Sequence, residues 1–239
     1  MKTMDLKQLL TENEYPGRGI VLGISEDARH AVIAYFITGR SVNSRNRIFV
    51  PQEDGGIITR AFDESKMIDP SLIIYAPVRV PHKGLFIVTN GDQTDTVYDF
   101  LTAGKSFEDA LRTRTFEPDA PNLTPRISGL VRVEDGAASF RLAIAKSDEG
   151  NENSVQRYFF EYPQPAAGVG RFLHTYRCNG HPIPSFEGEP ERVRLTGDLD
   201  TLTQTIWESL NDDNKVSLYT AFIDLETAEA STRIVNKNQ

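Results

Sequence analysis

The sequence has very little cysteine and no long apolar run. Its one cysteine, Cys178, excludes an intramolecular disulfide framework and is typical of a protein in a reducing compartment. No Cys-His signature surrounds Cys178, so we expect a small buried hydrophobic side chain rather than a nucleophile. No stretch approaches the ~18 consecutive apolar residues of a membrane span, and the N-terminus has no apolar signal region. We therefore expect a soluble, cytoplasmic protein with no membrane partner.

The common signatures of catalytic and cofactor sites are also missing. There is no phosphate-binding Gly-x-x-x-x-Gly-Lys, no dinucleotide-binding Gly-x-Gly-x-x-Gly after a strand, no His-Glu-x-x-His and no Cys-x-x-Cys. The histidines lie far apart, without the spacing of metal ligands, at His30, His82, His174 and His181. We therefore expect no transition-metal site.

Negative charge is absent from one segment of an acidic chain. The formal net charge of -8 argues against a general nucleic-acid binder, which would present a basic face. From Ala31 to Gln52, however, there is no Asp or Glu, and Arg40, Arg45 and Arg47 alternate with Ser and Asn. Guanidinium groups match phosphate and carboxylate oxygens in pairs, so this segment predicts an anion site. The alternative is a solvated basic loop.

Apolar periodicity and turn residues predict an α+β domain. A hydrophobic content of 39% is typical of a globular protein, and no repeat or long linker divides the chain, so we expect one domain spanning 1–239. We predict helices at 6–13, 92–103, 106–113 and 199–210. We predict strands at 20–24, 30–38, 48–50, 57–62, 71–80, 84–90, 126–133, 139–146, 155–162, 172–178 and 216–225. The Lys/Asn-rich C-terminal end is expected to fray.

Several polar residues fall at the ends of predicted strands, where functional loops concentrate. Besides the arginines above, these are Arg18, Tyr75, Asn90, Glu117, Asn122 and Arg126. Each has a structural alternative. Asn90 could open a helix, Tyr75 could be a core tyrosine, and Arg126 could pair with Asp119.

Taken together, these segments resemble the archaeal-type IMP cyclohydrolase family. The segments that carry the resemblance are Gly17-Arg18 before a hairpin, Tyr35 to Ser41 continuing to Ser44-Arg45-Asn46-Arg47, Thr89-Asn90-Gly91 with Thr94-Asp95, and Asn122 to Gly129. Their order and approximate spacing agree with the family. The resemblance covers about half of the chain, from Tyr15 to Gly129, and is thin afterwards. This chain is longer than the compact archaeal members, with an added N-terminal helix and a longer C-terminal part.

The resemblance implies both a fold and an activity. The fold would be a four-layer αββα sandwich like that of N-terminal-nucleophile hydrolases, without the processed nucleophile. The sequence begins Met1-Lys2, and no Ser, Thr or Cys is placed to become a new terminus. The activity would be closure of 5-formamidoimidazole-4-carboxamide ribonucleotide to inosine monophosphate (IMP) and water, the last step of de novo purine synthesis, with no cofactor. Whether the protein forms a homo-oligomer is left open. The alternatives are a non-catalytic purine nucleotide-binding module and an amide hydrolase of the N-terminal-nucleophile type.

The resemblance also implies a role for each candidate residue. Tyr75 and Glu117 would move protons, Arg45 would be the main electrophilic or positioning cation, and Lys83 would be a helper. The residues that would hold phosphate, ribose or carboxamide are Arg18, Arg40, Ser41, Asn90, Asn122 and Arg126. Arg47, nearest the next strand, is left without a role.

Overall fold

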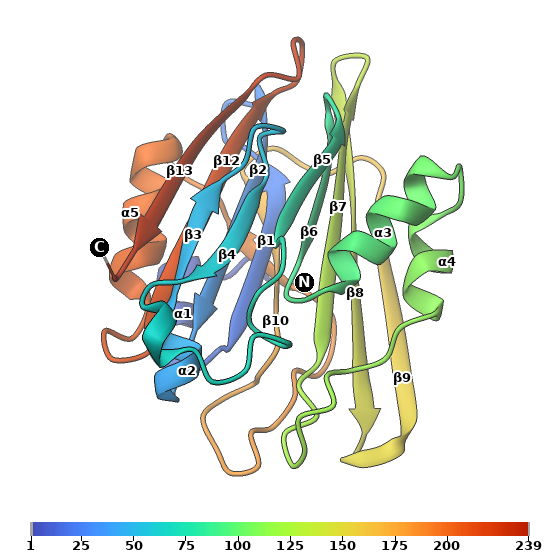
Figure 1. The fold of residues 1–239 in the computed structure, drawn as a ribbon. Coiled ribbons are helices and arrows are strands. Elements are labelled where there is room, and N and C mark those ends of the chain that lie inside the picture. The colour runs from blue at the N-terminus through green and yellow to red at the C-terminus, as the bar shows by residue number, and fades with distance from the viewer. Residues whose placement is uncertain (1, 239) are drawn as a thin grey trace.

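The computed structural model describes residues 2–238 and contains two antiparallel sheets (Figure 1). The six-stranded sheet has the order β11-β10-β1-β2-β12-β13. Its strands are β1 (Arg18–Ile24), β2 (His30–Thr38), β10 (Val169–His174), β11 (Glu191–Arg194), β12 (Lys215–Asp224) and β13 (Ala230–Asn236). The seven-stranded sheet runs from β3 to β9 in chain order. Its strands are β3 (Arg47–Pro51), β4 (Ile57–Ala61), β5 (Val78–His82), β6 (Leu85–Thr89), β7 (Arg126–Glu134), β8 (Ala137–Asp148) and β9 (Asn151–Tyr162).

Helices are short and lie mainly outside the sheets. They are α1 (Leu6–Glu12), α2 (Val42–Arg45), α3 (Gln93–Thr102), α4 (Phe107–Arg112) and α5 (Leu199–Ser209), with one 3₁₀ turn at Glu64–Lys66. Side chains of α1 and α5 pack with β1, β2 and β12 of the six-stranded sheet. Side chains of α3 and α4 pack with β6, β7 and β8 of the seven-stranded sheet. Within residues 2–238, no helix is long and apolar enough to cross a membrane.

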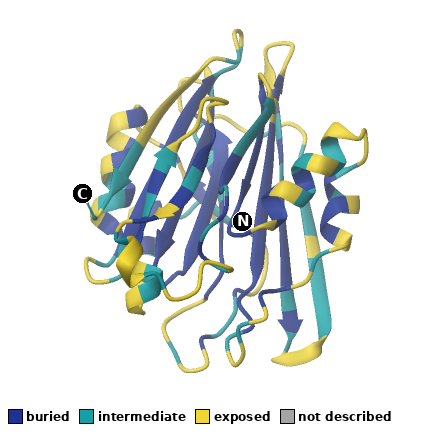
Figure 2. Cartoon of the chain, viewed as in Figure 1, coloured by how far each residue is buried: buried dark blue, intermediate teal, exposed yellow. Residues whose placement is uncertain are grey.

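Strand β2 shows why the interior is layered. Its residues are apolar almost throughout, and all but His30 are buried (Figure 2). Alternate side chains such as Ile33 and Tyr35 pack into the core shared by the two sheets. Those between them, such as Ala34 and Phe36, pack toward α1 and α5. Because side chains alternate along a strand, a nearly continuous apolar run is what a strand covered on both faces requires.

The α+β class and most of the predicted elements are confirmed, but one strand is wrong. Residues 71–77 form a loop, and β5 begins only at Val78. The apolar run suggested a strand because it contains Ile73 and Tyr75, which are buried in the structure although they lie in a loop. Their carbonyl groups both accept hydrogen bonds from the Thr59 hydroxyl, and the Tyr75 carbonyl also accepts from the Thr59 amide, so β4 holds the loop without a regular strand ladder.

Other differences fall at sheet edges and near the C-terminus. The strand predicted at 172–178 is β10, which ends at His174, and β9 begins four residues earlier than predicted. β11, β13 and α2 were not predicted. β13 pairs with β12 from Ser217↔Asn236 to Ile223↔Ala230, so it reaches the first residue of the Lys/Asn-rich end that was expected to fray. The next residue, Lys237, follows the strand, and its amide donates to the Val216 carbonyl. Cys178 is exposed, not buried. Met1 and Gln239 lie outside the described residues.

Candidate active site

A cleft of about 290 Å³ opens where the two sheets end together. Five segments far apart in sequence meet there: the start of β1, the loop after β2, the loop before β5, the loop before β7 and the loop after β10. The polar and charged side chains that line it are Arg18, Arg40, Ser41, Asn43, Ser44, Asp69, Glu117, Asp119, Asn122 and Thr124. Its apolar and aromatic lining comes from Tyr15, Leu72, Ile73, Tyr176 and Ile183. The volume is close to the ~300 Å³ lower limit of typical small-ligand pockets.

Arg18 is fixed in the cleft by the backbone around it. Gly17 has φ of 76°, and a Cβ there would lie 2.1 Å from the Thr175 hydroxyl, so only glycine fits. The Arg18 amide donates to the Thr175 hydroxyl at 3.1 Å, and the Arg18 carbonyl accepts from the Thr175 amide. The guanidinium is 8% exposed, and its Nε has no hydrogen-bond partner among the described residues. The backbone therefore holds a nearly buried cation at the start of β1.

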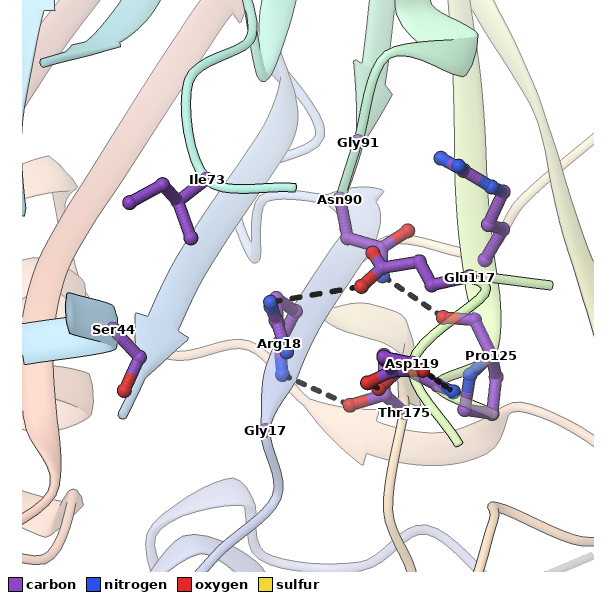
Figure 3. A network of polar contacts seen from close by, with 12 residues as sticks. Gly17, Arg18, Ser44, Ile73, Asn90, Gly91, Glu117, Asp119, Pro125 and Thr175 are labelled. Carbon is purple, nitrogen blue, oxygen red and sulfur yellow. Dashed lines mark hydrogen bonds and ion pairs between the residues drawn. The ribbon is translucent and has the colours of Figure 1, made fainter. Parts of the chain in front are cut away.

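Glu117 faces Arg18 across the cleft (Figure 3). Its Oε2 lies 4.0 Å from Arg18 Nη2, and its Oε1 has no hydrogen-bond partner within residues 2–238. The residue is 2% exposed. Burial raises the pKa of the Glu117 carboxyl from 4.5 to about 7, even though Arg18 and Arg126 act in the opposite direction. A carboxyl group with this pKa can take or give a proton at neutral pH.

Tyr75 and Arg47 form a second buried polar group next to Arg18. The Tyr75 hydroxyl lies 2.8 Å from that of Tyr35, and its amide donates to Thr59. Arg47 is fully buried and its Nε donates to the Ser44 carbonyl at 2.8 Å. Burial lowers the pKa of the Arg47 guanidinium, while nearby Tyr75 acts to raise it. Arg47 Nη1 and Nη2 have no hydrogen-bond partner among the described side chains and backbone groups.

These groups belong to one electrostatic cluster. Arg18 and Arg47 each affect the pKa of Glu117, and the phenol of Tyr75 affects the pKa of both arginines. Buried polar atoms without partners are rare in folded proteins. Four of the seven such side-chain atoms found among the described residues belong to Arg18, Arg47 and Glu117. This concentration is what a ligand-binding site would show.

Arg45 and Lys83 lie outside this cluster, in contrast to the roles we expected. Arg45 is exposed and does not line the cleft; its Nε donates to the Gly39 carbonyl and its Nη2 to Asn214. Arg45 is the last residue of the short helix α2 and is exposed, whereas the cation buried in the interior is Arg47. Lys83 lies in the turn between β5 and β6, where it pairs with Glu229 at 2.5 Å. That turn is at the end of β6 away from Asn90 and the cleft.

Asn90 and Arg126 are buried near the cluster but have protein partners. The Asn90 side chain donates to the Pro125 carbonyl and accepts from the Ile127 amide and Gln93 Nε2 (Figure 3). It thereby ties the end of β6 to the start of β7. Arg126 pairs with Asp92 at 2.6 Å, not with Asp119, which accepts hydrogen bonds from Thr124.

Three other predicted residues do reach the cleft. Arg40 donates to Asn179 Oδ1 and the Gly180 carbonyl, and lies 4.8 Å from the centre of the Tyr15 ring. Ser41 caps α2 by accepting from the Ser44 amide. Asn122 Oδ1 accepts from the Ile183 amide at 3.2 Å.

An aromatic wall was missed by the sequence analysis. Tyr15 and Tyr176 stack with ring centres 5.7 Å apart and an interplanar angle of 18°. The Tyr176 hydroxyl lies 2.5 Å from that of Thr124, which joins this wall to the Glu117 loop. Tyr15 stands directly before Pro16-Gly17-Arg18 and could have been noticed, whereas no motif surrounds Tyr176.

The cleft can therefore bind an anion, stack a planar group and exchange a proton at neutral pH. Within residues 2–238, no group of three or more His, Cys, Asp or Glu side chains is arranged to hold a metal ion.

Comparison with known proteins gives consistent matches over most of the chain. A family model described as IMP cyclohydrolase-like protein matches residues 15–228. A protein from Methanopyrus kandleri named IMP cyclohydrolase is 31% identical over 186 residues, covering 72% of this chain and 89% of that protein. A second protein of that name, from Methanothrix thermoacetophila, is 26% identical over 178 residues, covering 73% of this chain and 80% of that protein.

Proposed function

Because the chain belongs to the IMP cyclohydrolase-like family, we propose that it closes the purine ring of 5-formamidoimidazole-4-carboxamide ribonucleotide to give IMP and water. By class it is then a hydrolase that acts on carbon–nitrogen bonds in cyclic amidines and takes part in purine synthesis. The observation that carries the proposal is the buried Glu117, with a pKa of about 7, beside two cations that have unpartnered N–H groups. This arrangement suits a reaction that needs proton transfer and stabilisation of an oxyanion.

The reaction joins two groups that the substrate already carries. The carboxamide nitrogen attacks the formyl carbon, a carbon–nitrogen bond forms, and the formyl oxygen takes up negative charge. The carboxamide nitrogen then loses one proton and the former formamido nitrogen loses another. The oxygen takes up these two protons and leaves as water. Holding the two groups in contact supplies part of the acceleration, and charge stabilisation and proton transfer supply the rest.

We assign the proton transfers to Glu117 and Tyr75, and the oxyanion to Arg47. Glu117 accepts a proton from nitrogen, and Tyr75 donates one to the departing oxygen. Arg47 takes the role first expected of Arg45, because its unpartnered Nη groups are buried beside Tyr75. Lys83 is removed from the catalytic set because it is paired with Glu229 away from the cleft.

We assign substrate binding to the residues that line the cleft. Arg18, Arg40, Ser41 and Asn122 would hold the phosphate, ribose and carboxamide, and the stacked pair Tyr15 and Tyr176 would contact the planar base. Asn90 and Arg126 are proposed to support the Glu117 loop instead, because their polar atoms already bond to Pro125, Gln93 and Asp92.

The fold proposed with this function is the αββα sandwich of the N-terminal-nucleophile hydrolases, without a processed nucleophile. The packing of α1 and α5 on one sheet, and of α3 and α4 on the other, supports it. A core that takes side chains from both sheets supports a single domain over 1–239.

Turnover by the purified protein tests the proposal. We expect IMP to form from the formamido ribonucleotide without added nicotinamide or metal, and Glu117→Gln to lower kcat by ~100-fold or more. Glu187→Gln is the matched control, since Glu187 is an exposed carboxylate paired with Arg177 outside the cleft. Full activity in Glu117→Gln would reject the residue assignment.

The alternatives give different outcomes of the same experiment. A folded protein that binds IMP tightly but does not form it is a nucleotide-binding module. An amide hydrolase of the N-terminal-nucleophile type would show a processed terminus in its intact mass.

A further inference from the structure

Tyr35 is a buried tyrosine whose hydroxyl contacts that of Tyr75, a residue assigned above to proton transfer. It lies in the middle of β2 with no exposed surface, and its ring stacks on Phe49 with centres 5.7 Å apart. Its hydroxyl lies 2.8 Å from that of Tyr75, and this is the one hydrogen-bond partner found for it within residues 2–238. A buried polar group placed against a proposed catalytic group needs an explanation.

The burial of the two residues decides which hydroxyl donates. Each hydroxyl has one proton to donate. If Tyr75 donated to Tyr35, the Tyr35 proton would be left in the core without an acceptor, which is unfavourable. If Tyr35 donates to Tyr75, no buried donor is left over, and the Tyr75 proton is free to point elsewhere. Burial also raises the pKa of the Tyr35 hydroxyl well above its usual value, so it keeps its proton at neutral pH.

Tyr75 is buried close to the cleft, although it is not one of the side chains that line it. It is 6% exposed, and it directly follows the segment containing Leu72 and Ile73, which line the cleft. Its phenol also lies within electrostatic range of Arg18 and Arg47. A Tyr75 proton that is not used by Tyr35 is therefore available to a group bound beside Arg18, which lines the cleft.

We propose that Tyr35 is a positioning residue for the proposed reaction: it donates a hydrogen bond to the Tyr75 oxygen and thereby directs the Tyr75 proton to the substrate. This inference rests on the proposed function and deepens it. In the dehydration step the Tyr75 proton passes to the departing hydroxyl, which leaves as water. The nitrogen proton passes to Glu117, and proton transfer from the carboxyl to the phenolate through solvent restores both groups. The Tyr35 hydrogen bond stabilises the Tyr75 phenolate while it exists.

The first test is Tyr35→Phe, which removes only the hydroxyl. We expect kcat to fall about tenfold while KM stays within about twofold, because the lost hydrogen bond strengthens in the transition state and does not bind substrate. Circular dichroism of the variant should match that of wild type.

Tyr219→Phe is a matched control. Tyr219 is the cross-strand neighbour of Tyr35 on β12, is 1% exposed, and has a hydroxyl with no partner among the described residues. It is therefore a buried tyrosine in the same layer without a link to Tyr75. We expect Tyr219→Phe to keep the wild-type kcat.

A double-mutant cycle with Tyr75→Phe separates positioning from a structural role. If Tyr35 acts through Tyr75, adding Tyr35→Phe to Tyr75→Phe causes no further loss of kcat. Equal fractional losses in both backgrounds, a wild-type kcat for Tyr35→Phe, or an equal loss in Tyr219→Phe would each overturn the positioning role. Wild-type turnover is measured first: its absence overturns the proposed function, whereas turnover with an unaffected Tyr35→Phe overturns only this inference.

Discussion

At the scale of single residues, two arginines of one basic segment have opposite environments. Arg45 is exposed and bonded to Gly39 and Asn214, whereas Arg47 is fully buried with two unpartnered Nη groups. A buried cation without a partner destabilises a fold, so it is kept where a function needs it. The two arginines are only two residues apart in the sequence. They differ because Arg45 ends α2, whereas Arg47 begins β3.

Arg47→Met and Arg45→Ala test this difference. We expect Arg47→Met to lower kcat by ~100-fold or more while leaving the free energy of unfolding unchanged or higher, because it removes an uncompensated buried charge. Arg45→Ala should keep kcat within about threefold of wild type. Steady-state kinetics and thermal unfolding measure both. Equal losses of activity in the two variants would contradict the assignment of Arg47.

The raised pKa of Glu117 predicts a pH dependence of stability. The carboxyl has a pKa of about 7 in the folded protein against 4.5 for the ordinary group, so the folded state holds its proton more tightly. The protonated Glu117 carboxyl contributes its full stabilisation of the folded state below about pH 4.5, and this contribution is lost as the pH rises through about 7. A shift of this size corresponds to at most about 3 kcal/mol. Glu117→Gln should therefore gain stability over wild type between about pH 4 and pH 8.

Denaturant unfolding at several pH values measures this gain, and Glu187→Gln is again the control. A difference between Glu117→Gln and wild type that does not vary with pH would show that the carboxyl is not held protonated. In the kinetic experiment, kcat/KM of wild type should rise with pH through about 7, because Glu117 must be ionised to accept a proton.

At the scale of elements, one side chain joins the two sheets at an edge. Asn236, on β13, accepts a hydrogen bond from the Phe49 amide at 2.8 Å and donates to the Phe49 carbonyl at 3.1 Å. Phe49 lies in the middle of β3, which begins at Arg47. The last strand of one sheet thus fixes the first strand of the other, close to the proposed oxyanion cation.

Asn236→Ala should lower the free energy of unfolding by about 2 kcal/mol, because two backbone groups of Phe49 lose their partner. Thr232→Ala, at an exposed position of the same strand, should have little effect. Thermal unfolding of both variants measures the difference. If Asn236→Ala is as stable as Thr232→Ala, the contact between the strands does not contribute to stability.

The strands that could be predicted from the sequence are those whose side chains are buried on both faces of the sheet. β2 and β12 carry apolar residues on both faces and were evident from the sequence. β13 could not be recognised, because most of its side chains are exposed and only pairing with β12 defines it. Residues 71–77 show the converse, since apolar side chains can be buried from a loop as well as from a strand.

At the scale of the whole molecule, the sequence located the charged half of the site but not its aromatic half. Arg18, Arg40 and Glu117 come from segments with recognisable patterns and do meet in the cleft. Tyr176 arrives from a part of the chain without motifs, and it is placed beside Tyr15 because β10 pairs with β1. Only the sheet order brings these segments together, and pairing between distant strands cannot be read from local patterns.

The pairing of β2 with β12 has a consequence for how the protein is made. β2 is completed early in synthesis, whereas its neighbour β12 is formed from residues 215–224. Until those residues leave the ribosome, one side of an almost wholly apolar strand has no partner. Nascent chains of this length expose an edge that favours aggregation, and closure of such a distant contact is slow. The edge of β2 is therefore the part of the early chain most prone to aggregation until β12 is made.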